Sequence, residues 1–247
     1  MSLVVQVLGV LLAGGLAVAA RESPMTVATV VLAAAGGVVG VIGILGLYQG
    51  LAVGRMGVVA PVTGVLAAAL PVAVGIVEDG LPRATVIVGI GLAFVAVALV
   101  SRVAGPDGGR SGLEFAIVGG VGIGIFNVIV GGLPVGQVFG PLVVVKIAAA
   151  VAILVIAAVG RKPWRIPSAV LPVALLVGVF DMGGNALFVL ASQAGRLDVA
   201  ATLSSLYPVT TVILAILLLG ERPTRNHLAG IVAAGVAIAL ISSGSAG

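Results

Sequence analysis

Long apolar stretches separated by short polar breaks run through the whole chain. Each stretch holds about 20 residues, which is the length that an α-helix needs to cross the hydrocarbon core of a bilayer. Strands of a membrane barrel are excluded, because the apolar runs are too long and do not alternate with polar positions. The pattern predicts nine spans, at about residues 2–20, 27–52, 57–77, 84–102, 113–132, 139–160, 168–192, 198–219 and 226–244.

The composition agrees with a protein that lies in lipid. The chain is 61% hydrophobic and 8% charged, whereas soluble domains hold roughly 45–50% apolar and 25% charged residues. So few polar side chains cannot cover the core of a 247-residue soluble protein. Short breaks make neighbouring helices antiparallel. The predicted fold class is therefore an all-α polytopic membrane protein.

Several chemistries are excluded by the residue types present. Because the chain has no cysteine and one histidine, His227, disulfides, thiolate catalysis and multi-histidine metal sites are ruled out. The glycines from Gly120 to Gly124 lie inside a membrane-length span and do not form a nucleotide-binding loop. We therefore expect no cofactor, no metal and no direct use of ATP. The basic residues are scattered over short loops, which favours juxtamembrane charge over nucleic-acid binding.

The second half of the chain repeats the first half at a constant offset. Arg55 falls on Arg196 and Pro82 falls on Pro223, and no gap is needed anywhere between positions 54 and 101. A duplicated unit in so apolar a chain is typical of transporters that bind their substrate between two structural repeats.

The offset divides the chain into two repeats, residues 1–104 and residues 112–247. Four predicted spans fall in the first repeat and five in the second. The unmatched span is 113–132, so we expect that the first repeat lacks its opening helix. Repeats of five spans are related by inverted topology, because an odd number of crossings flips the second copy. Either the start codon is misplaced, or the protein works with nine spans.

The second repeat also carries a specific motif. Residues 203–211 read Leu-Ser-Ser-Leu-Tyr-Pro-Val-Thr-Thr, residues 219–223 read Leu-Gly-Glu-Arg-Pro, and Gly230 and Gly235 follow in the last span. This pattern closely resembles the last two helices of EamA-type transporters, which belong to the drug/metabolite transporter superfamily. The first repeat carries a decayed copy between residues 54 and 89.

The resemblance covers nearly the whole chain and implies a ten-helix fold with a central cavity. Such proteins usually export amino acids, nucleobase-like metabolites or other small organic molecules. This chain departs from the pattern because its first helix is missing. The family usually keeps its C-terminus inside, whereas the positive-inside rule favours an inside N-terminus and an outside C-terminus here. The orientation of the termini therefore stays open.

Two ionisable residues lie at membrane depth, where inserting a charge costs roughly 2.5–3.5 kcal/mol. Lys146 lies inside the 139–160 span, and Asp181 lies in the middle of the 168–192 span. Antiparallel neighbours can bring the two together, in contact with a zwitterionic substrate or exchanging protons with it. The alternatives are a purely structural ion pair, or a Lys146 that snorkels to the interface. The resemblance adds weight to Lys146, because EamA-type proteins often place a basic residue at this point of the helix.

Three further polar side chains lie within apolar runs. Asn127 and Asn185 each need a hydrogen-bond partner, because an unsatisfied buried amide costs a few kcal/mol. Facing a cavity they would orient a polar ligand, and facing another helix they would join the two helices. Tyr207 either holds a planar ligand or packs beside a proline kink.

Three residues of the motif have a structural interpretation. Pro208 removes a backbone hydrogen bond from its span, which suits a moving element or a static kink. Glu221 and Arg222 lie at a helix end, where a clamp of charge at the membrane surface is the favoured interpretation.

The leading hypothesis is a secondary transporter that exports a small organic metabolite (amino acid, nucleobase-like or drug-like) across the cytoplasmic membrane. Its two repeats would alternate access to a midplane cavity lined by Lys146, Asp181, Asn127, Asn185 and Tyr207. An intramembrane enzyme is disfavoured, because one histidine and no cysteine leave few catalytic groups. The alternative is an incomplete or non-transporting fragment that needs a partner helix. The expected partners are a small-molecule substrate and the bilayer, and the glycine faces also suit a homodimer.

Overall fold

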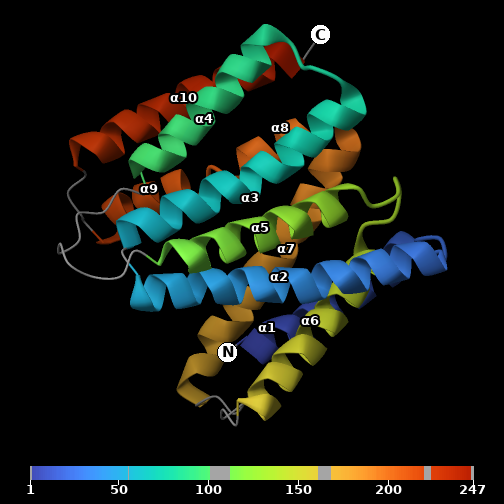
Figure 1. The fold of residues 1–247 in the computed structure, drawn as a ribbon. Helices are drawn as coiled ribbons and strands as arrows, with labels where there is room; N and C mark the ends of the chain where they lie inside the picture. The colour runs from blue at the N-terminus through green and yellow to red at the C-terminus, as the bar shows by residue number, and fades with distance from the viewer. Residues whose placement is uncertain (1, 55, 101–111, 161–167, 220–223, 246–247) are drawn as a thin grey trace. The chain divides into compact units, whose positions relative to one another are not determined.

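The computed structural model describes residues 2–54, 56–100, 112–160, 168–219 and 224–245, and every regular element in these ranges is a helix (Figure 1). A helix satisfies its own backbone hydrogen bonds, which a bilayer requires of any spanning segment. The elements are α1 (Ser2–Ala20), α2 (Val27–Val53), α3 (Met56–Asp79), α4 (Ala84–Val100), α5 (Leu113–Gly131), α6 (Phe139–Val159), the 3-10 helix η1 (Ser168–Val170), α7 (Leu171–Ala194), α8 (Leu197–Ser204), α9 (Tyr207–Leu219) and α10 (Arg225–Ser245).

The helices lie where the hydropathy pattern predicts spans. Among the described residues, six helices are long and apolar enough to cross a membrane, namely those within α1, α2, α3, α5, α6 and α7. The apolar parts of two others are shorter, at Ala84–Leu99 and Arg225–Ile241. The chain is thus a multi-pass membrane protein, and its described elements are all helices.

One predicted span differs from the structure. The segment 198–219 is two helices, α8 and α9, which are separated at Ser205 and Leu206. Pro208 has no backbone N–H, so the carbonyl of Ser204 loses its helical partner. The hydroxyl of Ser205 also donates to the carbonyl oxygen of Thr202 at 2.7 Å, which competes with continued helical bonding.

Contacts divide the chain into two compact units, which are described separately. The first holds Met1–Val41 and Ile129–Ala194, and the second holds Ile42–Val128 and Gly195–Gly247. Each unit therefore takes helices from both predicted repeats.

In the first unit, α1 packs against both α6 and α7. Glycine allows the close approach on α7, since a Cβ at Gly178 would lie 2.9 Å from Cδ2 of Leu8 in α1. Glycine has the same role on α2, since a Cβ at Gly37 would overlap the backbone carbonyl oxygen of Val145 in α6. Small residues of this kind let helix backbones approach each other in lipid, where no hydrophobic effect drives the association.

A glutamate in the α1–α2 connection holds the start of α6. Oε1 of Glu22 accepts the N–H groups of Val138 and Phe139 at 2.9 and 2.8 Å, and Oε2 accepts the N–H of Gly140 at 2.7 Å. The first amide groups of a helix have no partner within the helix. A carboxylate at this place satisfies them and complements the helix dipole.

Two glutamines join the same end of the first unit. Nε2 of Gln137 donates to Oγ of Ser23 and to the carbonyl oxygen of Pro24, both at 3.3 Å. Nε2 of Gln193, near the end of α7, donates to the carbonyl oxygens of Pro134 and Gln137 at 3.0 Å. The α1–α2 connection, the α5–α6 connection and the end of α7 are therefore linked by side chains.

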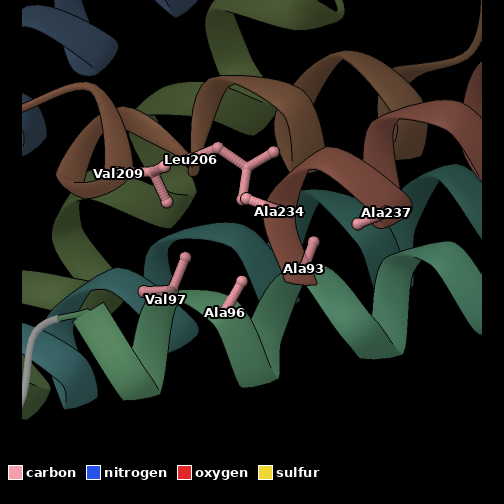
Figure 2. Close-up of a cluster of buried hydrophobic side chains, with 7 residues drawn as sticks. All are labelled: Ala93, Ala96, Val97, Leu206, Val209, Ala234 and Ala237. Atoms are coloured by element: carbon pink, nitrogen blue, oxygen red, sulfur yellow. The ribbon is translucent and has the colours of Figure 1, made fainter. Parts of the chain in front are cut away.

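In the second unit, α4 runs beside α10, and α3 packs against α8 (Figure 1). Figure 2 shows small apolar side chains that fill the space between α4, α10 and the start of α9. They are Ala93, Ala96, Val97, Leu206, Val209, Ala234 and Ala237. Four of the seven are alanines, so the backbones of α4 and α10 lie close together.

The helix bounds repeat at the offset seen in the sequence. The first residues of α3 and α8 correspond at this offset, as do the first residues of α4 and α10 and the last residues of α2 and α7. The packed pairs α1–α6, α3–α8 and α4–α10 each join a helix to its counterpart in the other half of the chain.

We predict that Gly37→Ala destabilises the protein, because the added methyl group would push α2 away from the backbone of α6. Overpacking of this kind typically costs about 1–3 kcal/mol. The matched control is Gly15→Ala in α1, where a Cβ would meet nothing within 4 Å. Thermal unfolding in detergent, followed by circular dichroism, should show a lower midpoint for Gly37→Ala alone. Equal midpoints for the two variants would contradict the close approach.

Candidate functional site

The first unit carries very little charge in its membrane-spanning helices. Helices α1 and α2 contain no charged residue, α6 contains Lys146, and α7 contains Asp181. A charge at membrane depth needs a counter-charge or contact with water. Each of these two residues is therefore the natural partner of the other.

The structure brings Lys146 and Asp181 together. Nζ of Lys146 donates to Oδ2 of Asp181 in an ion pair between α6 and α7. The two side chains differ in burial: Lys146 is 4% exposed and Asp181 is 36% exposed. The ammonium group is thus covered by protein, and the carboxylate presents the open side of the pair.

The Lys146 side chain reaches Asp181 across a glycine of α1. A Cβ at Gly9 would lie 3.1 Å from Cγ and Cδ of Lys146 and 3.2 Å from its Cε. The absence of a side chain at Gly9 therefore gives the lysine stem its path along α1. Gly9 thus helps to place the ammonium group by leaving room for the lysine stem, and not through a polar contact.

Asn185 completes this site. It lies one helical turn after Asp181, and its Nδ2 donates to the backbone oxygen of Asp181 at 2.7 Å and to Oδ1 at 3.4 Å. The amide therefore holds the carboxylate through the oxygen that the lysine does not contact. The predicted site residues Lys146, Asp181 and Asn185 thus form one polar cluster in the first unit.

The other two predicted cavity residues belong to the second unit. Nδ2 of Asn127 in α5 donates to the backbone oxygen of Ala67 in α3 at 3.5 Å, an interhelical contact of the kind that joins helices. Tyr207 is the first residue of α9 and is 53% exposed. Pro208 follows it in α9, although its side chain lies outside the described part, as do Glu221 and Arg222.

A fully buried carboxylate, Asp198, was not predicted from the sequence. Asp198 is fully buried at the start of α8, and Arg196 binds it through Nε–Oδ1 and Nη2–Oδ2 contacts of 3.1 and 3.0 Å. The guanidinium also donates to the backbone oxygens of Asp79 and Gly80 at 3.1 and 2.6 Å. The hydrogen bond to Asp198 raises the pKa of Arg196, so the guanidinium stays charged. The ion pair of Arg196 and Asp198 is called the arginine clamp below. In the sequence, the Gly-Arg pair that recurs in both repeats was the signal from which this ion pair could have been predicted.

A cavity of about 360 Å³ lies beside this clamp in the second unit. It is lined by Leu81, Pro82, Arg83, Val86, Gly195, Arg196, Val199 and Gly244. None of the predicted site residues lines it. The carboxylate of Asp198 and those at the end of α3 offset the positive charge of the arginines that line the cavity. The cavity therefore does not favour an anion.

We predict that the single neutralising variants differ in stability. Asp181→Asn should cost about 3–5 kcal/mol, because it leaves a buried ammonium without a counter-charge. Lys146→Met should cost less, because the carboxylate that it leaves behind is 36% exposed. The double variant should recover most of the loss.

The stabilities of the wild type, the two single variants and the double variant are compared through their thermal unfolding midpoints in detergent, as a double-mutant cycle. The control is Ile147→Met, a change at an exposed apolar position next to Lys146. Additive losses in the double variant would show that the two charges do not stabilise each other.

Comparisons with known proteins agree with this architecture. No curated protein matches the chain in sequence. A solved crystal structure has a TM-score of 0.69 and 17% sequence identity to this chain, over 99% of this chain and 86% of its own. This likeness shows a shared fold. The family model for the EamA-like transporter family matches residues 110–243, more than half of the 247 residues. The chain belongs to the EamA-like transporter family.

Proposed function

We propose that this protein is a secondary transporter that exports a small organic metabolite across the cytoplasmic membrane by alternating access. Its membership of a transporter family and its apolar helices support transport as the general role. The observation that carries the proposal further is the polar cluster of Lys146, Asp181 and Asn185 at membrane depth.

The partial exposure of Asp181 favours a site over a structural pair. A purely structural ion pair in lipid is expected to be covered on all sides, because exposed charge in hydrocarbon is costly. Asp181 is instead 36% exposed. Its open side therefore needs water or a polar ligand, which a substrate pathway supplies.

The repeat supports the alternating-access part of the proposal. In transporters with inverted repeats, equivalent helices of the two halves pack around a pseudo-two-fold axis, and access changes when one set rocks against the other. The pairs α1–α6, α3–α8 and α4–α10 each join a helix to its counterpart at the sequence offset, which is the pairing that such a mechanism requires. Repeat units of five spans would give these pairs an inverted relation.

We predict that neutralising the whole pair abolishes substrate recognition while leaving the fold intact. The purified wild type and the double variant Lys146→Met/Asp181→Asn are screened by thermal shift against amino acids, nucleobases, sugars and organic cations. Ligand at about 100 times its Kd stabilises a protein by about 2.7 kcal/mol. At least one class should therefore stabilise the wild type and leave the double variant unchanged.

The ligand found in this way is then tested for counterflow in proteoliposomes. The control is Ile147→Met/Leu187→Met, which changes two exposed apolar positions on the same helices and keeps both charges. The control should exchange ligand at the wild-type rate, and the double neutral variant should lose most of it. A double neutral variant that exchanges ligand at the wild-type rate would sink the proposed site.

A further inference from the structure

The open side of the polar cluster offers acceptors. The carboxylate of Asp181 is 36% exposed, while the Lys146 side chain is 4% exposed. Nδ2 of Asn185 is already used in bonds to Asp181. A ligand that approaches the cluster therefore meets a carboxylate before it can reach the ammonium of Lys146.

A second acceptor lies on α1. Oε1 of Gln6 is buried and accepts no hydrogen bond from any described residue. Gln6 precedes Gly9 by three positions, so the two share the face of α1 along which the Lys146 stem lies. A buried acceptor without a donor is rare in folded proteins and calls for an explanation, such as a donor that reaches it in another state of the site.

The balance of charge decides what binding requires. The pair is neutral as it stands, and α1, α2, α6 and α7 contribute no other charged group. An added cation at Asp181 would leave the covered ammonium of Lys146 without its counter-ion, at a large cost. Neutrality of the site then requires that one proton leaves it for each cation bound.

From these observations we propose that the cluster recognises an organic amine through its ammonium group and releases one proton for each amine bound. The ammonium of the ligand takes the place of Lys146 at Asp181. The neutral Lys146 keeps N–H groups, and the unpartnered acceptor Oε1 of Gln6 lies on the face of α1 along which the lysine stem runs. This inference rests on the proposed function and specifies its substrate class.

The test uses two matched sets of three compounds that differ in charge. Phenylalanine is compared with phenethylamine and 3-phenylpropionate, and norvaline is compared with butylamine and pentanoate. Binding to the purified full-length protein in detergent is measured by calorimetry between pH 6 and pH 8, and proton release is measured in weak buffer. We expect the amine to bind most tightly in at least one set, with one proton released.

The pH dependence distinguishes exchange from simple attraction. Exchange of one cation for one proton makes the Kd fall about tenfold for each unit of rising pH. Lys146→Met should still bind the amine, but with a Kd that does not change with pH, because the competing ammonium is gone. Asp181→Asn and the double variant Lys146→Met/Asp181→Asn should not bind it, and the double variant covers the case in which the single one fails to fold.

Other results would overturn the amine inference. Tightest binding of the amino acid or of the acid, equal binding of all three compounds, or binding of none would each do so. A Kd that does not change with pH in the wild type would remove the proton exchange. The proposed function stands or falls separately, because it requires only that some ligand is exchanged by the wild type and not by the double neutral variant.

Discussion

Lys146 and Asp181 are the charged groups that the membrane-spanning helices of the first unit carry, and the covered ammonium of Lys146 depends on the carboxylate of Asp181. Their contact joins α6 and α7, both of which pack against α1. It also explains why α1 has a glycine at position 9, since any larger residue would meet the lysine stem. The packing of the unit and the chemistry of its polar cluster therefore depend on the same ion pair.

Close approach of backbones is the second constraint. Lipid offers no hydrophobic gain to helix association, so contacts must come from dispersion at short range and from hydrogen bonds. Gly37 and Gly178 provide this on the first unit, and four alanines provide it between α4 and α10. Gly37 and Gly178 also occupy equivalent positions of the two repeats, so the duplicated sequence kept the same packing solution in both halves.

The sequence predicts the positions of most helices well, because bilayer thickness sets the length of a span and polar residues mark its ends. It also allows Lys146 and Asp181 to meet, because antiparallel neighbouring helices can bring them together, and the structure shows that they do. The unequal burial of the pair was not predictable, because it depends on the path of a side chain over Gly9. The partner of Asn127 was equally hidden, since it is a backbone carbonyl and no residue type marks it.

The break between α8 and α9 could have been inferred, because Pro208 withholds a backbone hydrogen bond from Ser204. The polar contacts at helix ends were harder to foresee. Arg196 and Glu22 lie in short loops, where a basic residue is usually taken as a topology signal and an acidic one as part of the polar surface. Their roles depend on which helix end lies opposite them, and only the fold supplies that information.

The hydrogen bonds between Glu22 and the start of α6 have a consequence for the hydrogen exchange of the backbone amides. The first amides of a helix normally exchange fast with solvent, because no helical carbonyl protects them. Here the amides of Val138, Phe139 and Gly140 are each bound to one carboxylate. Exchange at these three positions requires their hydrogen bonds to the carboxylate of Glu22 to break. The degree to which these amides are protected from exchange therefore reports on local opening between the α1–α2 connection and the start of α6. Hydrogen exchange of these three amides thus measures local unfolding at the start of α6 without an added label.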